Sequence, residues 1–324
     1  MRKLAVIFAA MLGALSVAWL TLKRFFRSRE DRDWSAAQGP GRTVEVDGVT
    51  LHYIEKALPI GGHVPAIVMV HGFGGHTYSY RYQLEDLGQD YRCIAIDLKG
   101  FGYSERPETG DYSLSEQARL VLGAMDRLGI ERATLIGHSM GGEVVMRMAE
   151  MAPERVDKLI LAATVPGKKV RLAPRIGAMR PLMVPLARFT AWSSWRRLFY
   201  DPSKLDIEAI RAAYTRPARI HGSLNTVWQM WDDVRHNDEP IDHSRITMPV
   251  LILWAERERI LPLPGSSLRW LQKRLPNATT VHIPRTGHML LEEQPAAATD
   301  AIRGFLEGER ADPVSLTDAM PLSA

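Results

Sequence analysis

The sequence predicts an α/β protein built on a mostly parallel, doubly wound sheet with a helical insertion. Short runs that are largely apolar, such as AIVMV at 66–70 and KLILA at 158–162, alternate with segments of helical periodicity. Strands that are apolar on both faces are typical of parallel sheets covered by helices on each side. This alternation is interrupted once, between residues 165 and 245. The chain has 324 residues, 46% of them hydrophobic and 24% charged, which is enough for one large domain plus an insertion.

The elements follow from local signals along the chain. The Asp47-Gly48 pair lies between two alternating runs and predicts a β-hairpin. Ser113 and Glu116 form a capping box, which predicts the start of a helix. The other expected strands are 66–70, 93–98, 133–139, 158–164, 249–256 and 279–283, and the other expected helices begin after Ser139 or cover 82–87, 268–275 and 295–306.

The N-terminus carries an apolar run, LAVIFAAMLGALSVAWLTL, at residues 4–22. A helix of these 19 residues, at about 1.5 Å per residue, just spans the hydrocarbon core of a bilayer. A cleaved signal peptide is the alternative, but its apolar core is usually shorter and ends at a small-x-small site. We therefore expect an uncleaved single-pass membrane anchor. Two basic residues precede the run and five follow it closely, which favours a cytoplasmic location for the rest of the chain.

The formal net charge of +4 raises the question of a nucleic-acid partner. The sequence has no zinc-ligand spacing, no aromatic-basic RNA motif and no basic recognition helix, so we expect none. Its single cysteine, Cys93, cannot form an intrachain disulfide, and the fold therefore does not depend on oxidising conditions.

The stretch LIGHSMGGEV at 135–144 places Ser139 between an expected strand and an expected helix. A strand that leads directly into a helix needs a tight, strained turn, in which bulky residues two positions to either side would collide with neighbouring elements. Gly137 and Gly141 remove these collisions. The turn lifts the Ser139 hydroxyl above the sheet and presents the first N–H groups of the helix, as in a nucleophile elbow.

A serine nucleophile needs a general base, and the base needs a carboxylate to orient it. His288 follows the last expected strand on a short glycine-bearing loop, where open α/β sheets gather functional groups. His71 and His138 flank glycines near the same edge; we expect them to organise turns, with His138 also a candidate substrate contact. The acid should follow the strand VLILWAE, and both Glu256 and Glu258 are candidates there.

These motifs together resemble the α/β-hydrolase fold superfamily, in its group of capped serine hydrolases. The resemblance covers about residues 43–307, and its motifs are HGFGG at 71–75, DLKGFGYS at 97–104, GHSMGG at 137–142, the W-x-E-x-x-x-x-x-P loop at 254–262, and GH at 287–288 followed by EEQP. It implies a hydrolase core at 35–164 and 246–308 with a helical cap at 165–245. The sequence itself adds an anchor with its basic flank at 1–34 and a flexible tail at 309–324.

The resemblance also implies roles for individual residues. The family's acid is normally an aspartate four residues before the proline of its loop, and here that position is Glu258. Glutamate is one methylene longer, and the family includes Ser-His-Glu triads, so Glu258 is expected to be the acid with Glu256 as the alternative. Met140 and Phe73 are expected to supply the oxyanion-hole N–H groups, with Gly74 as an alternative to Phe73. Asp97, Gly100, Gly102 and Ser104 are expected to be structural.

The serine at the elbow separates the chain from the epoxide hydrolases and haloalkane dehalogenases of this fold, which carry aspartate there. It implies acyl transfer to water, with a carboxylic ester as the expected substrate and no metal or organic cofactor. The same triad supports C–C bond hydrolysis, lactone opening or perhydrolysis, and some relatives are slow-turnover binding proteins. These alternatives stay open.

The first part of the expected cap mixes basic and large apolar residues. Residues 166–200 contain no Asp or Glu, eight Lys or Arg residues, and aromatic residues that include Trp192 and Trp195. This composition suits a surface on anionic lipid headgroups, and it also suits a cap with an apolar inner face and a solvated outer face. We expect Trp192 and Trp195 to contact substrate, and a lipid-partitioning ester such as a monoacylglycerol would fit the anchored enzyme.

Overall fold

The computed structural model describes residues 30–37, 39–57, 64–164, 196–261 and 264–308. Its strands are β1 (Arg42–Val46), β2 (Val49–Lys56), β3 (Ala66–Val70), β4 (Arg92–Ile96), β5 (Ala133–His138), β6 (Val156–Ala162), β7 (Val250–Ala255) and β8 (Ala278–Ile283). Its helices are α2 (Arg81–Leu87), α3 (Leu114–Arg127), α4 (Met140–Met151), α6 (Ile207–Thr215), α7 (Ser223–His236), α8 (Pro264–Arg274), α9 (Leu290–Glu293) and α10 (Pro295–Glu307).

The eight strands form one sheet in the order β1-β2-β4-β3-β5-β6-β7-β8. Strands β3 to β8 run parallel, whereas β1 and β2 pair antiparallel and β2 pairs antiparallel with β4. This confirms the predicted mostly parallel sheet. The β1–β2 hairpin also turns at the predicted residues, since Asp47 and Gly48 both have a positive φ, at 49° and 77°.

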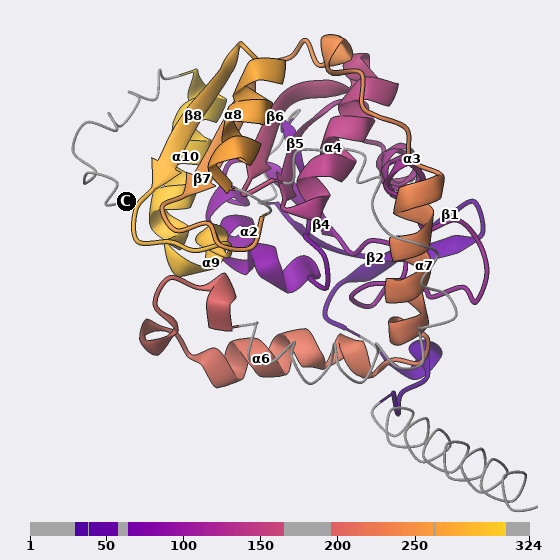
Figure 1. Cartoon of the computed structure of the whole chain (residues 1–324). Coiled ribbons are helices and arrows are strands. Elements are labelled where there is room, and N and C mark those ends of the chain that lie inside the picture. The colour runs from indigo at the N-terminus through magenta and orange to yellow at the C-terminus, as the bar shows by residue number, and fades with distance from the viewer. Residues whose placement is uncertain (1–29, 38, 58–63, 165–195, 262–263, 309–324) are drawn as a thin grey trace, which may run out of the picture.

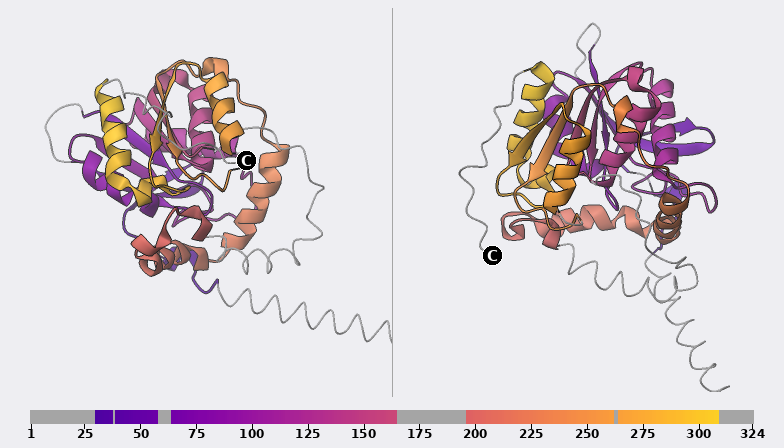
Figure 2. Two further views of the ribbon diagram at one scale, coloured as in Figure 1. Left: turned by 60° about the vertical axis from the view of Figure 1, so that its left-hand side comes forward. Right: turned by 45° about the horizontal axis from the view of Figure 1, so that its top comes forward.

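Helices cover both faces of the sheet, as Figures 1 and 2 show. Buried residues of α3, α4 and α8 form one apolar cluster with the strands, and those of α2, α9 and α10 form the other. The parallel strands β3 and β5 are apolar on both faces because each face is packed against one of these helical layers. Ser113 caps α3 at the predicted position, because its side chain accepts the Glu116 N–H. The second bond of a capping box does not form, since the Ser113 N–H donates to Asp111.

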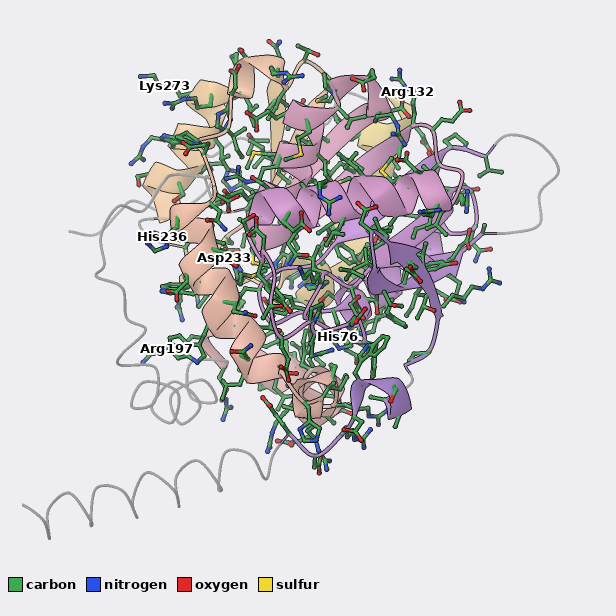
Figure 3. All side chains as sticks on the ribbon, turned by 90° about the vertical axis from the view of Figure 1, so that its right-hand side faces the viewer. His76, Arg132, Arg197, Asp233, His236 and Lys273 are labelled. Carbon is green, nitrogen blue, oxygen red and sulfur yellow. The ribbon has the colours of Figure 1, made fainter. Side chains whose placement is uncertain are left out.

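Between β6 and β7 the described chain is helical, with α6 and α7 as its longest elements. Helix α6 lies below the sheet and its covering helices (Figure 1), whereas Met230 of α7 packs into the same apolar cluster as α3 and α4. Helix α7 is fixed to the core by Asp233, whose carboxylate accepts the Tyr112 N–H at 2.8 Å. Figure 3 shows Asp233 and His236 on this helix. The first part of the expected cap, residues 165–195, lies outside the described residues.

The segment before β1 is more ordered than the sequence indicates. Trp34–Ala36 form a 3-10 helix. The Trp34 indole N–H donates to the Tyr103 carbonyl at 2.9 Å, and Arg32 forms a parallel bridge with Ile220. The N-terminal segment therefore contacts both the core and the helical insertion. None of the described helices is long and apolar enough to cross a membrane, and the expected anchor at 4–22 lies outside the described residues.

Candidate active site

Ser139 stands at the turn between β5 and α4, in a backbone conformation that few residues adopt. Its φ of 53° and ψ of −116° lie outside the allowed regions for an L-residue, so the surrounding structure must hold it there. The Ser139 N–H donates to the Ala162 carbonyl on β6 at 2.9 Å, which fixes the turn to the sheet. The serine side chain is half-buried at the end of the strand.

The elbow requires glycine at positions 137 and 141, because a side chain there would collide with neighbouring backbone. A Cβ atom at Gly137 would lie 2.4 Å from the carbonyl oxygen of Gly141, in the first turn of α4. A Cβ atom at Gly141 would lie 2.1 Å from the carbonyl oxygen of Val70, at the end of β3. Both contacts are with backbone atoms, which cannot rotate away, so any larger residue would push the helix off the sheet. The steric account of the G-x-S-x-G pattern agrees with this geometry.

His288 and Glu258 meet on the loops that follow β8 and β7. The His288 Nδ1 atom lies 2.7 Å from Glu258 Oε2, and both residues are buried, with 5% and 8% of their surface exposed. The other carboxylate oxygen accepts the N–H groups of Ile260 at 2.8 Å and Leu261 at 3.2 Å. Because the carboxylate accepts, the histidine must carry its proton on Nδ1 and present a basic Nε2.

Electrostatics keep the Glu258 carboxylate ionised. Burial alone would raise its pKa, but the hydrogen bond and charge of His288, with the two backbone N–H donors, hold the pKa of Glu258 below its ordinary value. Glu256 has a different environment: it is exposed, and its carboxylate accepts the Arg285 N–H at 2.7 Å. Of the two glutamates that the sequence offered, the structure brings Glu258 to His288.

His138 connects the serine turn with the histidine loop. Its Nε2–H donates to the His288 carbonyl at 2.8 Å, and the two rings lie 5.0 Å apart between centroids. Burial, followed by the neighbouring His288, lowers the pKa of His138 to about 3, so its ring is neutral. Among the described residues, no hydrogen bond joins Ser139 Oγ to His288. Catalytic hydrogen bonds of this kind often tighten only when substrate binds.

Met140 and Phe73 are the residues expected to supply the N–H groups of an oxyanion hole. Met140 is the first residue of α4, and the first N–H groups of a helix have no partner inside the helix. Phe73 lies in the loop after β3, next to Gly74 with its positive φ of 69°. In the described part of the chain, neither Met140 nor Phe73 donates one of the loop and cap hydrogen bonds. The Phe73 side chain is 51% exposed, with its edge against Phe101.

The remaining motif residues organise turns. The His71 ring accepts the Leu98 N–H at 3.0 Å through Nε2, and its Nδ1–H donates to the Gly72 carbonyl. The buried Asp97 carboxylate accepts the N–H groups of Thr77 and Tyr103. These contacts join the loops that follow β3 and β4. The expected substrate contacts Trp192 and Trp195 lie outside the described residues, and no cluster of three possible metal ligands occurs among the residues that the structure describes.

Sequence reasoning missed the contacts between the helical insertion and the loop after His288. The Tyr214 hydroxyl on α6 donates to the Glu292 carboxylate and lies 2.8 Å from Ser79 Oγ. Arg81 donates to the same carboxylate at 2.5 Å. The run EEQP was visible in the sequence as a motif, but nothing in it indicated that its glutamates contact the insertion.

The family model described as alpha/beta hydrolase fold matches residues 65–295. Among curated proteins, the uncharacterized hydrolase YugF of Bacillus subtilis is 31% identical over 281 residues, covering 84% of this chain and 99% of the relative. Epoxide hydrolase 1 of Caenorhabditis elegans is 25% identical over 302 residues, covering 82% of this chain and 70% of the relative.

Solved structures have the same fold. The crystal structure of a membrane phospholipase A, described as a bacterial virulence factor, aligns with a TM-score of 0.69 at 24% identity and covers 96% of this chain and 100% of its own. The 2-hydroxy-6-oxo-6-phenylhexa-2,4-dienoate hydrolase of Rhodococcus sp. strain RHA1 aligns with a TM-score of 0.68 at 25% identity, covering 82% of this chain and 99% of its own.

Proposed function

The chain belongs to the α/β-hydrolase fold family and is a hydrolase, and we propose that it is a serine hydrolase of carboxylic esters. Its triad is Ser139, His288 and Glu258. The observation that carries this proposal is the buried hydrogen bond of 2.7 Å between His288 Nδ1 and Glu258 Oε2. His138, which directly precedes Ser139 in the strained elbow, donates to the His288 carbonyl and so links the two loops. The pair of His288 and Glu258 has the chemistry of a base and its orienting acid.

The first half of the reaction forms an acyl-enzyme. His288 Nε2 takes the proton of Ser139 Oγ as this oxygen attacks the ester carbonyl, and the tetrahedral intermediate then expels the alcohol, which takes the proton from His288. Glu258 stays ionised and stabilises the positive charge on the imidazolium. In the second half, water attacks the acyl-serine with His288 again as base, and the carboxylic acid leaves.

The oxyanion is stabilised by the N–H groups of Met140 and Phe73. The Met140 N–H lies at the positive end of the α4 dipole, which favours a negative charge there. Loss of one such donor raises the barrier by about 3 kcal/mol in comparable enzymes. Gly74 remains the alternative second donor, and His138, Trp192 and Trp195 remain proposed substrate contacts.

Ser139 argues against epoxide hydrolysis, although a relative carries that name. Opening an epoxide through a covalent intermediate needs a carboxylate nucleophile, because the ester so formed can be hydrolysed. A serine would form an ether, which the triad cannot cleave with water. The chemistry of the nucleophile therefore favours acyl transfer.

Cleavage of a C–C bond is the second candidate. It is favoured by the similarity to the Rhodococcus hydrolase, which is 25% identical over 82% of this chain. The same triad can attack the carbonyl group of a vinylogous 1,5-diketone, and the leaving group is then a dienolate carbon. Lactone opening needs no change in the triad.

We also propose that residues 4–22 anchor the enzyme in a membrane, with the core on the cytoplasmic side. The apolar length of 19 residues and the excess of basic residues after it support this proposal. An anchored hydrolase would act on esters that partition into lipid, such as monoacylglycerols. Carbonate extraction of membranes tests the anchor: the full chain should stay in the pellet, and its release into the wash would contradict the proposal.

A substrate series tests the reaction class. Detergent-solubilised wild type and Ser139→Ala should be compared on p-nitrophenyl esters of increasing acyl length and on a meta-cleavage dienoate. We expect ester turnover with an optimum chain length, none in Ser139→Ala, and little cleavage of the dienoate. The reverse preference would establish the C–C hydrolase, and binding of esters without multiple turnover would favour a binding protein.

A further inference from the structure

The carboxylate of Glu293 joins the histidine loop to the start of the described cap. Its Oε2 accepts the Gly287 N–H at 2.6 Å, directly before His288. Its Oε1 accepts the Tyr200 N–H at 2.6 Å and the Asp201 N–H at 3.3 Å. One side chain therefore satisfies N–H groups on two segments that are more than 80 residues apart in the chain.

Residues 198–201, here called the cap entry segment, also pack directly against this loop. The Met289 N–H donates to the Leu198 carbonyl at 3.3 Å. A Cβ atom at Gly287 would lie 2.5 Å from the same carbonyl oxygen, so only glycine allows this close approach. Both chain neighbours of His288 are thus fixed to the cap entry segment, one directly and one through Glu293.

The cap entry segment also touches the acid loop. The Arg257 guanidinium lies over the Tyr200 ring, 4.1 Å from its centroid, and Arg257 directly precedes Glu258. The Arg257 N–H donates to the Thr286 carbonyl at 3.0 Å, which joins the acid and histidine loops to each other. Tyr200 is therefore in contact with both loops that carry the proposed base and its acid.

We propose that Glu293 is a positioning residue that fastens the His288 loop to the cap entry segment, so that the cap's placement sets how His288 is aligned with Ser139. The inference rests on the proposed triad. Glu293 does not touch the reacting atoms. It acts through the backbone on each side of His288, and a shift of about 1 Å at such a group can lower a rate about 100-fold.

The Glu293→Gln variant isolates this role, because it keeps the shape of the side chain. A carboxylate offers an acceptor oxygen to each of the two segments, whereas an amide offers one oxygen and turns its NH2 group toward a backbone N–H on the other side. One of the two segments must then move away. Glu293→Asp keeps the charge but is too short to span both segments, and it tests the same role without the amide.

The experiment measures kcat and KM of the full-length enzyme on p-nitrophenyl butyrate. The concentration of active sites is determined by titration with a fluorophosphonate, and kcat is calculated per active site. For Glu293→Gln we expect kcat to fall about 10- to 100-fold, with KM changed less than about threefold. The kcat of Glu293→Asp should lie between the values for Glu293→Gln and wild type. The control is Glu154→Gln, at an exposed position beyond the far end of α4, and it should match wild type.

The outcomes separate this inference from the triad proposal. If wild type shows no ester turnover, the proposed function fails. If wild type turns over and both Glu293 variants keep kcat per titrated site within about twofold, Glu293 does not position His288, whatever its effect on thermal unfolding. If Glu293→Gln does not fold, Glu293→Asp alone decides.

Discussion

Ser139 is the clearest case of a residue that the surrounding fold holds in a strained backbone conformation. Its φ of 53° and ψ of −116° cost free energy, on the order of 1–3 kcal/mol for such backbone strain. The strain persists because the turn is fixed by the sheet on one side and by α4 on the other. This conformation can be predicted from sequence, because Gly137 and Gly141, which make room for the turn, are part of the G-x-S-x-G pattern.

The Glu258→Gln substitution tests the acid of the triad. The amide cannot stabilise a positive imidazolium and favours the wrong tautomer of His288, so kcat should fall by about 10³- to 10⁴-fold. Glu256→Gln is the matched control, since this exposed carboxylate accepts the Arg285 N–H away from His288, and the kcat of this variant should change less than about tenfold. Steady-state ester hydrolysis measures both. A larger loss in Glu256→Gln would reassign the acid.

Substitution at Gly141 tests the steric account of the elbow. In Gly141→Ala the new Cβ atom would lie 2.1 Å from the Val70 carbonyl oxygen, so we expect a loss of at least about 3 kcal/mol in the free energy of unfolding. Gly265→Ala is the control: its Cβ atom meets nothing closer than 3.6 Å, and a change between zero and about 1 kcal/mol of added stability is expected. Urea unfolding compares the two, and equal stabilities would contradict the account.

Buried neutral histidines predict how stability depends on pH. Burial lowers the pKa of His76 from 6.5 to about 4, so the folded state binds fewer protons than the unfolded state between these values. The contribution to the free energy of unfolding is full above pH 6.5 and falls as the pH drops toward 4, by about 1 kcal/mol per pH unit. His138, whose pKa is lowered to about 3, adds to this dependence of the free energy of unfolding on pH.

The His76→Gln variant should show a shallower loss of stability than wild type as the pH is lowered. His236→Gln, at an exposed position on α7, is the control and should keep the wild-type slope (Figure 3). Urea unfolding at several pH values between about 7 and 5 gives both slopes. An unchanged slope in His76→Gln would show that His76 is not held neutral.

At the scale of the elements, the sequence predicted strands and helices correctly where buried residues recur at regular positions along the chain. The strands β3, β5 and β7 were predicted correctly because both of their faces are buried, and the start of α3 because Ser113 caps the helix through a local contact. The sequence also placed Ser139 and His288 at the same sheet edge. The sequence did not distinguish Glu256 from Glu258 as the acid. The choice depends on the path of the loop after β7, which buries Glu258 and leaves Glu256 exposed.

Contacts between a carboxylate and backbone N–H groups escaped sequence reasoning. The partners of Glu293 are the N–H groups of Gly287, Tyr200 and Asp201, and any residue except proline offers the same donor. No residue type therefore marks the partner in the sequence. The same holds for Glu30, whose carboxylate accepts the Leu224 N–H at 2.8 Å.

At the scale of the whole molecule, the described N-terminal segment is fixed to the helical insertion. The Glu30 carboxylate caps α7 by accepting the N–H groups of Gly222 and Leu224, and Asp31 pairs with Arg219. Trp34 packs with Tyr103 and Ile220 in a small apolar cluster. Residues 30–37 are thus fixed to the helical insertion as well as to the core.

The Glu30→Ala substitution tests this tie in the full-length protein. Loss of a side-chain cap costs about 1 kcal/mol, which for a chain of this size lowers the melting temperature by about 2 °C. Glu131→Ala, at an exposed loop position, is the control and should not change it. Differential scanning calorimetry measures both. If Glu30→Ala melts at the same temperature as wild type and Glu131→Ala, the N-terminal segment does not stabilise the helical insertion.

The central claim is that Ser139 is a nucleophile activated by His288 and Glu258. The most direct measurement is reaction of the detergent-solubilised full chain with a fluorophosphonate, followed by peptide mass spectrometry. We predict one adduct on the peptide that contains Ser139, no adduct in Ser139→Ala, and much slower labelling in Glu258→Gln. Labelling that is absent from wild type, or that persists in Ser139→Ala, would contradict the claim.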